Sequence, residues 1–221
     1  YRRHEVDYDL ALARAAGADG NHTPGLVVPS EVKDDVTRIL EALGASARPL
    51  VVCHVGARNG SAKRWPPASW ARLCDHLVHA RGCTVIFTGA PGDACLVEDV
   101  RRGMRNRSWS TVGKTDVARL LGLIAEADLV ITGDSAPVHL ASAVDTPVIA
   151  MYGPTDPVVY GPWSATGRVV SARLPCSPCY DLRTTAECPW NVSPAPCMSA
   201  ISAHRMFLLA SGLLDASGVT R

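Results

Sequence analysis

The sequence has no run of about 18 or more apolar residues, the length that a membrane-spanning helix needs. Residues 1–7 also have no apolar core of the kind found in secretory signal peptides. Neither sign of charge is in excess, because 22 lysine and arginine residues stand against 21 aspartate and glutamate residues. A balanced charge gives no electrostatic reason to expect nucleic acid as a partner. We therefore expect a soluble, cytoplasmic domain that binds a small molecule.

Several nucleotide-binding and catalytic motifs are also missing. No Gly-x-Gly-x-x-Gly follows an expected strand, and no P-loop pattern is present. These two absences argue against an NAD-dependent oxidoreductase and against an ATPase. A serine nucleophile elbow is absent as well.

What the sequence does have is an alternation of short apolar strands with amphipathic helices. The expected strands lie at residues 50–55, 83–88, 109–112, 128–132 and 147–151. Two helices precede them, at residues 5–16 and 30–43. This order predicts an α/β domain with a Rossmann-like, mostly parallel sheet and flanking helices. Beyond Tyr160 the periodicity fails until a C-terminal helix near residues 201–214.

The length of 221 residues suits one α/β domain with appended segments. We divide the chain into leading helices and a linker (1–49), a Rossmann-like core (50–160), a Pro/Cys-rich segment (161–200) and a C-terminal helix (201–221). The first residue is Tyr1 rather than Met, so we expect a piece of something longer.

The turn after the fourth expected strand carries the most chemistry. Asp134, Ser135 and Ala136 lie between a strand and a helix, where backbone N–H groups can approach a phosphate. His139 is one turn into that helix and could face the same ligand. The alternative is that Asp134 only caps the helix and that His139 is an ordinary surface or core histidine.

Two other loops at strand ends add candidate groups. Lys63 follows the first strand, so its ammonium would stand beside a crevice at the carboxyl ends of the strands. A solvated loop charge is the alternative for Lys63. Asp93 ends a Gly-rich turn, where it could cap the next helix or lie near a ribose, and this signal is weak.

The eight cysteines fall into two groups. Four occur singly in apolar runs and are interpreted as ordinary core residues: Cys53, Cys74, Cys83 and Cys95. The other four crowd into the Pro-rich stretch: Cys176, Cys179, Cys188 and Cys197. Four thiols at this spacing suit a tetrahedral zinc site. Free thiols in a packed loop and disulfides are the alternatives, and a cytoplasmic location disfavours disulfides.

Taken together, several stretches in this order resemble glycosyltransferase family 9, the ADP-heptose:lipopolysaccharide heptosyltransferases. The stretches are Lys63 to Pro66 with Trp70, Gly89 to Asp93, Gly133 to Leu140, and Tyr152 to Pro157. The resemblance covers about residues 50–200. It implies two Rossmann-like domains facing across a cleft, the GT-B fold. This chain would be the C-terminal, donor-binding half, and residues 1–49 would come from the link to a missing N-terminal domain.

The resemblance also implies partners and roles. The donor would be an ADP-sugar, with Lys63 on the diphosphate or sugar, Asp134 on the sugar, and Ser135, Ala136 and His139 on the phosphates. Ala136 stands where family members often have Gly, and its methyl group would narrow the phosphate approach. The missing half would supply the glycolipid acceptor site and the catalytic base. No cofactor is needed for the chemistry. The resemblance does not settle whether the clustered cysteines hold a metal, which would be a structural zinc or another metal.

We also expect the full protein to associate peripherally with a membrane and not to bind nucleic acid. The alternative from another functional class is that the protein is not an enzyme but a nucleotide-sugar-binding or interaction module with a structural metal site. A second Rossmann-like half upstream, with an acidic residue in its first loop, would favour the enzyme.

Overall fold

The computed structural model describes residues 2–19, 25–57, 60–180 and 187–218. Its centre is a parallel sheet of six strands in the order β3-β2-β1-β4-β5-β6. The strands are β1 (Leu50–His54), β2 (Thr84–Thr88), β3 (Trp109–Ser110), β4 (Leu129–Gly133), β5 (Val148–Tyr152) and β6 (Gly167–Ser171).

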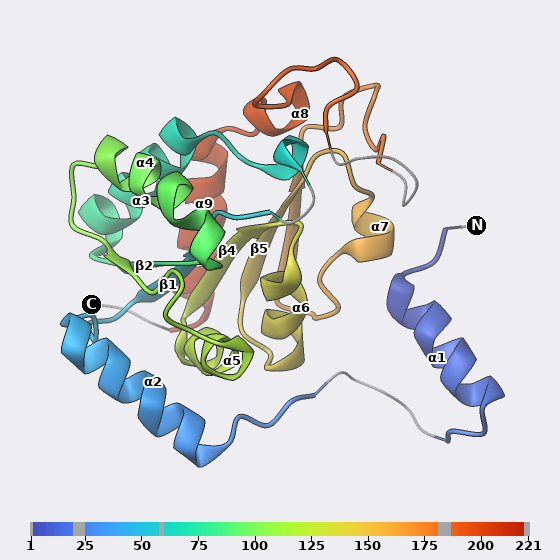
Figure 1. The fold of residues 1–221 in the computed structure, drawn as a ribbon, viewed down its shortest axis with the longest axis horizontal. Helices are drawn as coiled ribbons and strands as arrows, with labels where there is room; N and C mark the ends of the chain where they lie inside the picture. Colours follow the sequence, from blue (N-terminus) through green and yellow to red (C-terminus); the bar gives the residue numbers. More distant parts are fainter. Residues whose placement is uncertain (1, 20–24, 58–59, 181–186, 219–221) are drawn as a thin grey trace.

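Helices cover both faces of this sheet (Figure 1). They are α1 (Glu5–Ala15), α2 (Ser30–Leu43), α3 (Pro67–Arg81), α4 (Ala94–Gly103), α5 (Val117–Glu126), α6 (Ala136–Ala143), α7 (Pro157–Tyr160), α8 (Pro196–Ser199) and α9 (Ala203–Ala216). Two short 3₁₀ turns, η1 (Ser61–Lys63) and η2 (Pro91–Asp93), follow β1 and β2.

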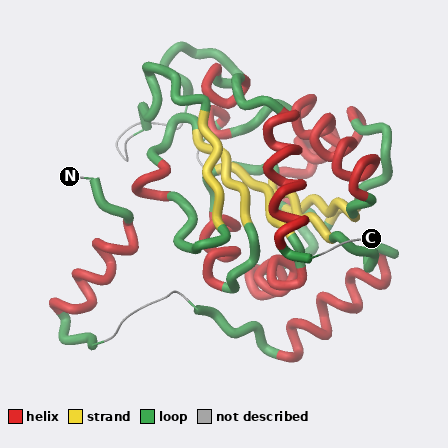
Figure 2. Tube along the Cα trace, turned by 180° about the vertical axis from the view of Figure 1, so that it is seen from behind, coloured by secondary structure: helices red, strands yellow, loops and turns green. Residues whose placement is uncertain are grey.

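The strands are apolar on both sides because each side is packed against helices. Val51 and Cys53 of β1 belong to the core cluster that α3, α4 and α9 share. Leu50 and Val52 belong to the cluster formed with α2, α5 and α6. Figure 2, from the opposite side to Figure 1, shows α9 lying across the sheet. The sheet is therefore the middle layer of three.

The strand order reverses between β1 and β4. From β1 the chain moves outward through β2 to β3, and from β4 it moves the other way through β5 to β6. Val51 of β1 pairs with Val85 on one side and with Leu129 on the other. Loops that leave neighbouring strands at such a reversal diverge and open a crevice, which is the usual ligand site in open α/β sheets.

Most elements lie where the sequence places them, and two helix starts need comment. Asp116 caps α5, since its carboxylate accepts a hydrogen bond from the N–H of Arg119 at 2.8 Å. Asp93 does not cap α4 with its side chain. Its carboxylate accepts from the N–H of Ala90 at 2.9 Å, which closes η2 instead.

The stretch beyond Tyr160, where the periodicity fails, contains two elements that the sequence pattern does not indicate, β6 and α8. The edge strand β6 pairs only with β5, and within it only Val170 is buried. It therefore has no continuous apolar run of the kind that marks the central strands. The sheet thus extends into the segment that the sequence marks as Pro/Cys-rich.

The two leading helices differ in how they meet the sheet domain. Val36 and Leu40 of α2 are buried in the core cluster shared with α5. Helix α1 has no buried residue and lies beside α7, outside the helical layers (Figures 1 and 2). Its N-cap residue His4 contacts the main domain through the carbonyl oxygen of Gly161 at 2.9 Å. No helix among residues 2–19, 25–57, 60–180 and 187–218 is long and apolar enough to cross a membrane.

The contact between α2 and α5 can be tested with two glycine substitutions. A Cβ at Gly122 of α5 would lie 2.9 Å from side-chain carbons of Val32 and Val36, whereas one at Gly212 of α9 would meet nothing within 4 Å. We expect Gly212→Ala to raise the free energy of unfolding by about 0.5–1 kcal/mol through helix propensity. Gly122→Ala should lower it, because overpacking costs about 1–3 kcal/mol. Denaturant unfolding of both variants checks this, and equal stabilisation by the two would contradict the packing of α2 on α5.

Candidate functional site

Two predicted site residues meet across the β1/β4 reversal. Lys63 ends η1, which follows β1, and Asp134 comes directly after β4. The Lys63 Nζ lies 2.7 Å from the Asp134 Oδ2, and the two side chains are only 13% and 11% exposed. Lys63 is therefore not a solvated loop charge.

The Lys63 ammonium also has an aromatic neighbour. It lies 4.6 Å from the ring centroid of Tyr180, a half-buried residue of the Pro/Cys-rich segment. An ion pair that is this well shielded from water is strongly coupled, so the loss of either partner leaves an uncompensated charge. The Lys63 ammonium is thus held between a carboxylate and an aromatic ring.

The start of α6 offers a small group of hydrogen-bond donors. Ser135 is its N-cap residue, but the Ser135 hydroxyl pairs with the Thr132 hydroxyl at 2.9 Å rather than with a helix N–H. Pro137 has no N–H, and the N–H of Val138 donates to the Ser135 carbonyl at 3.0 Å. Within the part of the chain that the structure describes, the N–H groups of Ser135 and Ala136 have no backbone partner. The backbone donors that the sequence offers to a phosphate are therefore limited to these two N–H groups.

The alternative role for Asp134, as the N-cap of α6, is wrong. The cap residue is Ser135, whose backbone is extended, and the Asp134 carboxylate is turned to Lys63. Ala136 is exposed, and the effect of its methyl group on a phosphate stays a prediction.

His139 is exposed one turn into α6, near enough to Asp134 for that carboxylate to influence its titration. Partial desolvation lowers the pKa of His139, His4 lowers it further, and Asp134 acts in the opposite direction. A histidine with a lowered pKa is neutral at physiological pH. At this pH, His139 can offer a ligand a neutral ring rather than a charge.

A second group of residues gathers at the ends of β1 and β2. The half-buried His54 ends β1, and its Nδ1 has no hydrogen-bond partner among the described residues. Burial lowers the pKa of His54 against the opposing effect of Asp93. A Cβ at Gly56 would lie 2.5 Å from the Asp93 Oδ2, and one at Gly89 would lie 2.9 Å from it. Both loops thus need glycine to admit this carboxylate. A role for Asp93 at a ribose stays a prediction.

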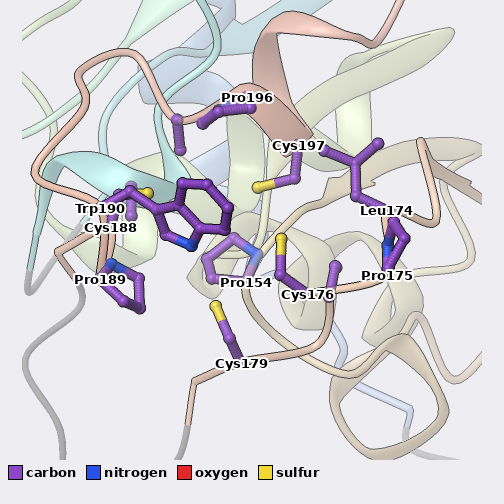
Figure 3. A pocket seen from close by; sticks show the side chains of 13 residues that line it. Pro154, Leu174, Pro175, Cys176, Cys179, Cys188, Pro189, Trp190, Pro196 and Cys197 are labelled. Carbon is purple, nitrogen blue, oxygen red and sulfur yellow. The ribbon is translucent and has the colours of Figure 1, made fainter.

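The four cysteines of the Pro/Cys-rich segment do come together. All of them line one cavity of about 310 Å³, together with Pro154, Leu174 and Trp190. Figure 3 shows Cys176, Cys179 and Cys197 around Pro154, with the Trp190 ring beside them. All eight cysteines of the chain are free thiols in the structure.

The donor set suits a soft metal ion, because four thiols share one cavity. Among the residues that the structure describes, however, no three potential ligands stand close enough together to hold an ion. Burial and neighbouring thiols raise the pKa of Cys179 and of Cys197, so both are protonated at neutral pH. Metal binding would need these thiols to lose protons and to approach one another. The zinc site stays a prediction.

The other cysteines follow the sequence prediction with one exception. Cys53, Cys74 and Cys83 are buried in the core as expected. Cys95 is exposed, so its assignment to the core is wrong. It lies near the start of α4, whose buried side chains are Val97 and Val100.

Sequence reasoning also missed two residues that touch the site. Tyr180 contacts Lys63, and Glu187 accepts hydrogen bonds from Ser61. Both belong to the Pro/Cys-rich segment, far from Lys63 in sequence. No local motif marks them, because their role depends on how that segment folds back over η1.

The six-stranded parallel sheet flanked by helices matches the fold seen in GT-B glycosyltransferase structures. Residues 1–189 match the family described as Glycosyltransferase family 9 (heptosyltransferase). The chain belongs to this family, which confirms the resemblance seen in its motifs.

Individual relatives agree with this assignment. The chain is 38% identical to lipopolysaccharide heptosyltransferase 3 of Escherichia coli (strain K12) over 165 residues, which are 73% of this chain and 47% of that protein. The fold is similar to that of a family 9 glycosyl transferase from Veillonella parvula DSM 2008, with a TM-score of 0.79, 23% identity, and coverage of 98% of this chain and 61% of that one. It is also similar to the E. coli heptosyltransferase WaaC with ADP, with a TM-score of 0.65, 21% identity, and coverage of 96% and 57%. The matched region spans less than half the length of the first curated relatives.

The cysteine cavity generates a metal prediction with a matched control. Protein purified without chelator and kept reduced should carry close to one equivalent of zinc, and zinc uptake should rise with pH because the ligands are thiolates. Cys176→Ser and Cys179→Ser should lower the zinc content, whereas Cys95→Ser should not. Elemental analysis measures this, and a metal-free parent protein would rule the site out.

Proposed function

We propose that this chain is the donor-binding half of a heptosyltransferase and holds an ADP-sugar at the carboxyl ends of β1 and β4. The single observation that carries the proposal is the meeting of Lys63 with Asp134 beside the N–H groups of Ser135 and Ala136 at the start of α6, which have no backbone partner among the described residues. A cation and backbone donors are what a diphosphate needs, and a carboxylate is what sugar hydroxyls need. The solved structure of a family relative with ADP supports adenine as the base.

The proposed reaction is an inverting transfer. An acceptor hydroxyl loses its proton to a base, its oxygen forms a bond to the anomeric carbon of the sugar, and the bond from that carbon to the diphosphate breaks. Negative charge then develops on the leaving ADP. Lys63 and the N–H groups of Ser135 and Ala136 are placed to stabilise that charge, so this chain would serve the leaving-group side.

The remaining parts of the reaction are assigned to the rest of the protein. We propose that an N-terminal half brings the catalytic base and a lipopolysaccharide-type glycolipid acceptor, and that the whole protein works at the cytoplasmic side of a membrane. The transfer itself needs no cofactor.

Lys63 should matter more than His139 for binding the diphosphate. A lysine ammonium keeps its charge from about pH 6 to 9, so Lys63→Ala should weaken ADP binding throughout this range. The expected loss is about 1–3 kcal/mol, which is about 5- to 150-fold. His139→Ala should have little effect near pH 8 and more effect as the pH falls, because the lowered pKa of His139 leaves its ring neutral at pH 8.

Calorimetric titration with ADP checks both variants, and UDP serves as the control for base preference. Parent-like binding by Lys63→Ala, together with loss of binding by His139→Ala at pH 8, would show that the imidazole and not the ammonium anchors the phosphates.

Asp134 should distinguish ADP-heptose from ADP. The Asp134 carboxylate competes with a diphosphate for the Lys63 ammonium, and it is proposed to bind the sugar hydroxyls. Asp134→Asn should therefore bind ADP at least as tightly as the parent and lose the preference for ADP-heptose. Titration with the two ligands separates these effects. An equal loss for both would mean that Asp134 acts only by holding Lys63 in place.

A further inference from the structure

The Pro/Cys-rich segment reaches the donor site at two points. The Glu187 carboxylate accepts hydrogen bonds from the N–H of Ser61 at 3.3 Å and from the Ser61 hydroxyl at 2.7 Å. These bonds lower the pKa of Glu187, so it is a charged acceptor at neutral pH. Tyr180 meets the ammonium of Lys63 at the other end of the same 3₁₀ turn. Both ends of η1 are thus held by residues more than 110 positions away in the sequence.

Tyr180 is itself held by the loop that follows β5. Its N–H and the N–H of Cys179 both donate to the carbonyl oxygen of Pro154 at 2.8 Å. The Ser177 hydroxyl donates to the neighbouring carbonyl of Gly153. These bonds link Tyr180 to the end of a fully buried strand. The backbone that carries the Tyr180 ring is therefore anchored to the loop that follows β5.

An aromatic ring has a particular advantage beside a ligand-binding lysine. The ring face attracts the ammonium but offers no carboxylate or carbonyl oxygen to occupy its N–H groups. An ammonium has three donors, and Asp134 takes one of them. A ring in the position of Tyr180 can thus orient the long Lys63 side chain and leave donors available for a phosphate.

We propose that Tyr180 and Glu187 are positioning residues of the donor site, which act by holding Lys63 and its turn in place for the diphosphate. This inference rests on the proposed function, since it assigns a purpose to the site of Lys63. It makes the Pro/Cys-rich segment a part of the donor site and not an independent appendage.

The test compares Tyr180→Leu, which removes the ring, with Tyr180→Phe, which keeps it, by titrating the protein with ADP. Tyr180→Leu should weaken ADP binding about three- to tenfold, while Tyr180→Phe should bind as the parent does. Thermal unfolding should place both variants close to the parent, because Tyr180 is only half-buried. Equal affinities for Tyr180→Leu and the parent would overturn the role of the ring.

Double mutants show whether these residues act through Lys63. In a Lys63→Ala background, Tyr180→Leu should cause no further loss, because the group that it positions is gone. Glu187→Ala and Ser61→Ala should each weaken ADP binding. The variant that carries both substitutions should bind ADP as tightly as either single variant. If Tyr180→Leu weakens ADP binding as much in the Lys63→Ala background as in the parent, the positioning role is overturned, since Tyr180 would then contact the ligand directly.

The same experiment separates this inference from the proposed function. If Lys63→Ala alone binds ADP as the parent does, the proposed phosphate contact fails. If Lys63→Ala weakens binding but the Tyr180 and Glu187 variants do not, only the positioning role fails.

Discussion

The ion pair between Lys63 and Asp134 is the interaction on which the site depends. It joins the loops that leave β1 and β4, the two strands between which the order of the sheet reverses. The pair is shielded from water, since the two side chains are only 13% and 11% exposed. In the proposed function, it brings a cation for the diphosphate and a carboxylate for the sugar to the edge of the sheet where ligands bind in open α/β folds. The same two residues would then supply both charges of the site.

The central part of the fold follows from the sequence, because β1, β2, β4 and β5 are continuous apolar runs between turn residues. Such runs fit only strands covered on both faces, and the structure buries them in two helical layers. The edge strand β6 could not be found this way, since within it only Val170 is buried. Cys95 shows that the burial of a single residue cannot be predicted in this way either. Its apolar neighbours in the sequence do not determine whether its side chain lies on the buried or the exposed face of α4.

The candidate site could be predicted only where its residues lie next to a strand end. Lys63 and Asp134 are found because each follows a recognisable strand and matches a family motif. Their direct contact was not predicted, because it depends on β1 and β4 being neighbours in the sheet. Tyr180 and Glu187 carry no local signal, since their contacts with η1 arise from the path of a segment that has no regular periodicity.

The start of α6 bears on the role proposed for Lys63. A helix start can bind phosphate through several N–H groups, but Pro137 has none and the N–H of Val138 is already paired. Among the described residues, the N–H groups of Ser135 and Ala136 have no backbone partner, and the Ala136 methyl group is expected to narrow the approach of a phosphate to them. In the proposed function, a diphosphate with so few backbone donors would depend more heavily on Lys63. Tyr180 and Glu187, which are proposed to position Lys63, would then contribute to ligand affinity without touching the ligand.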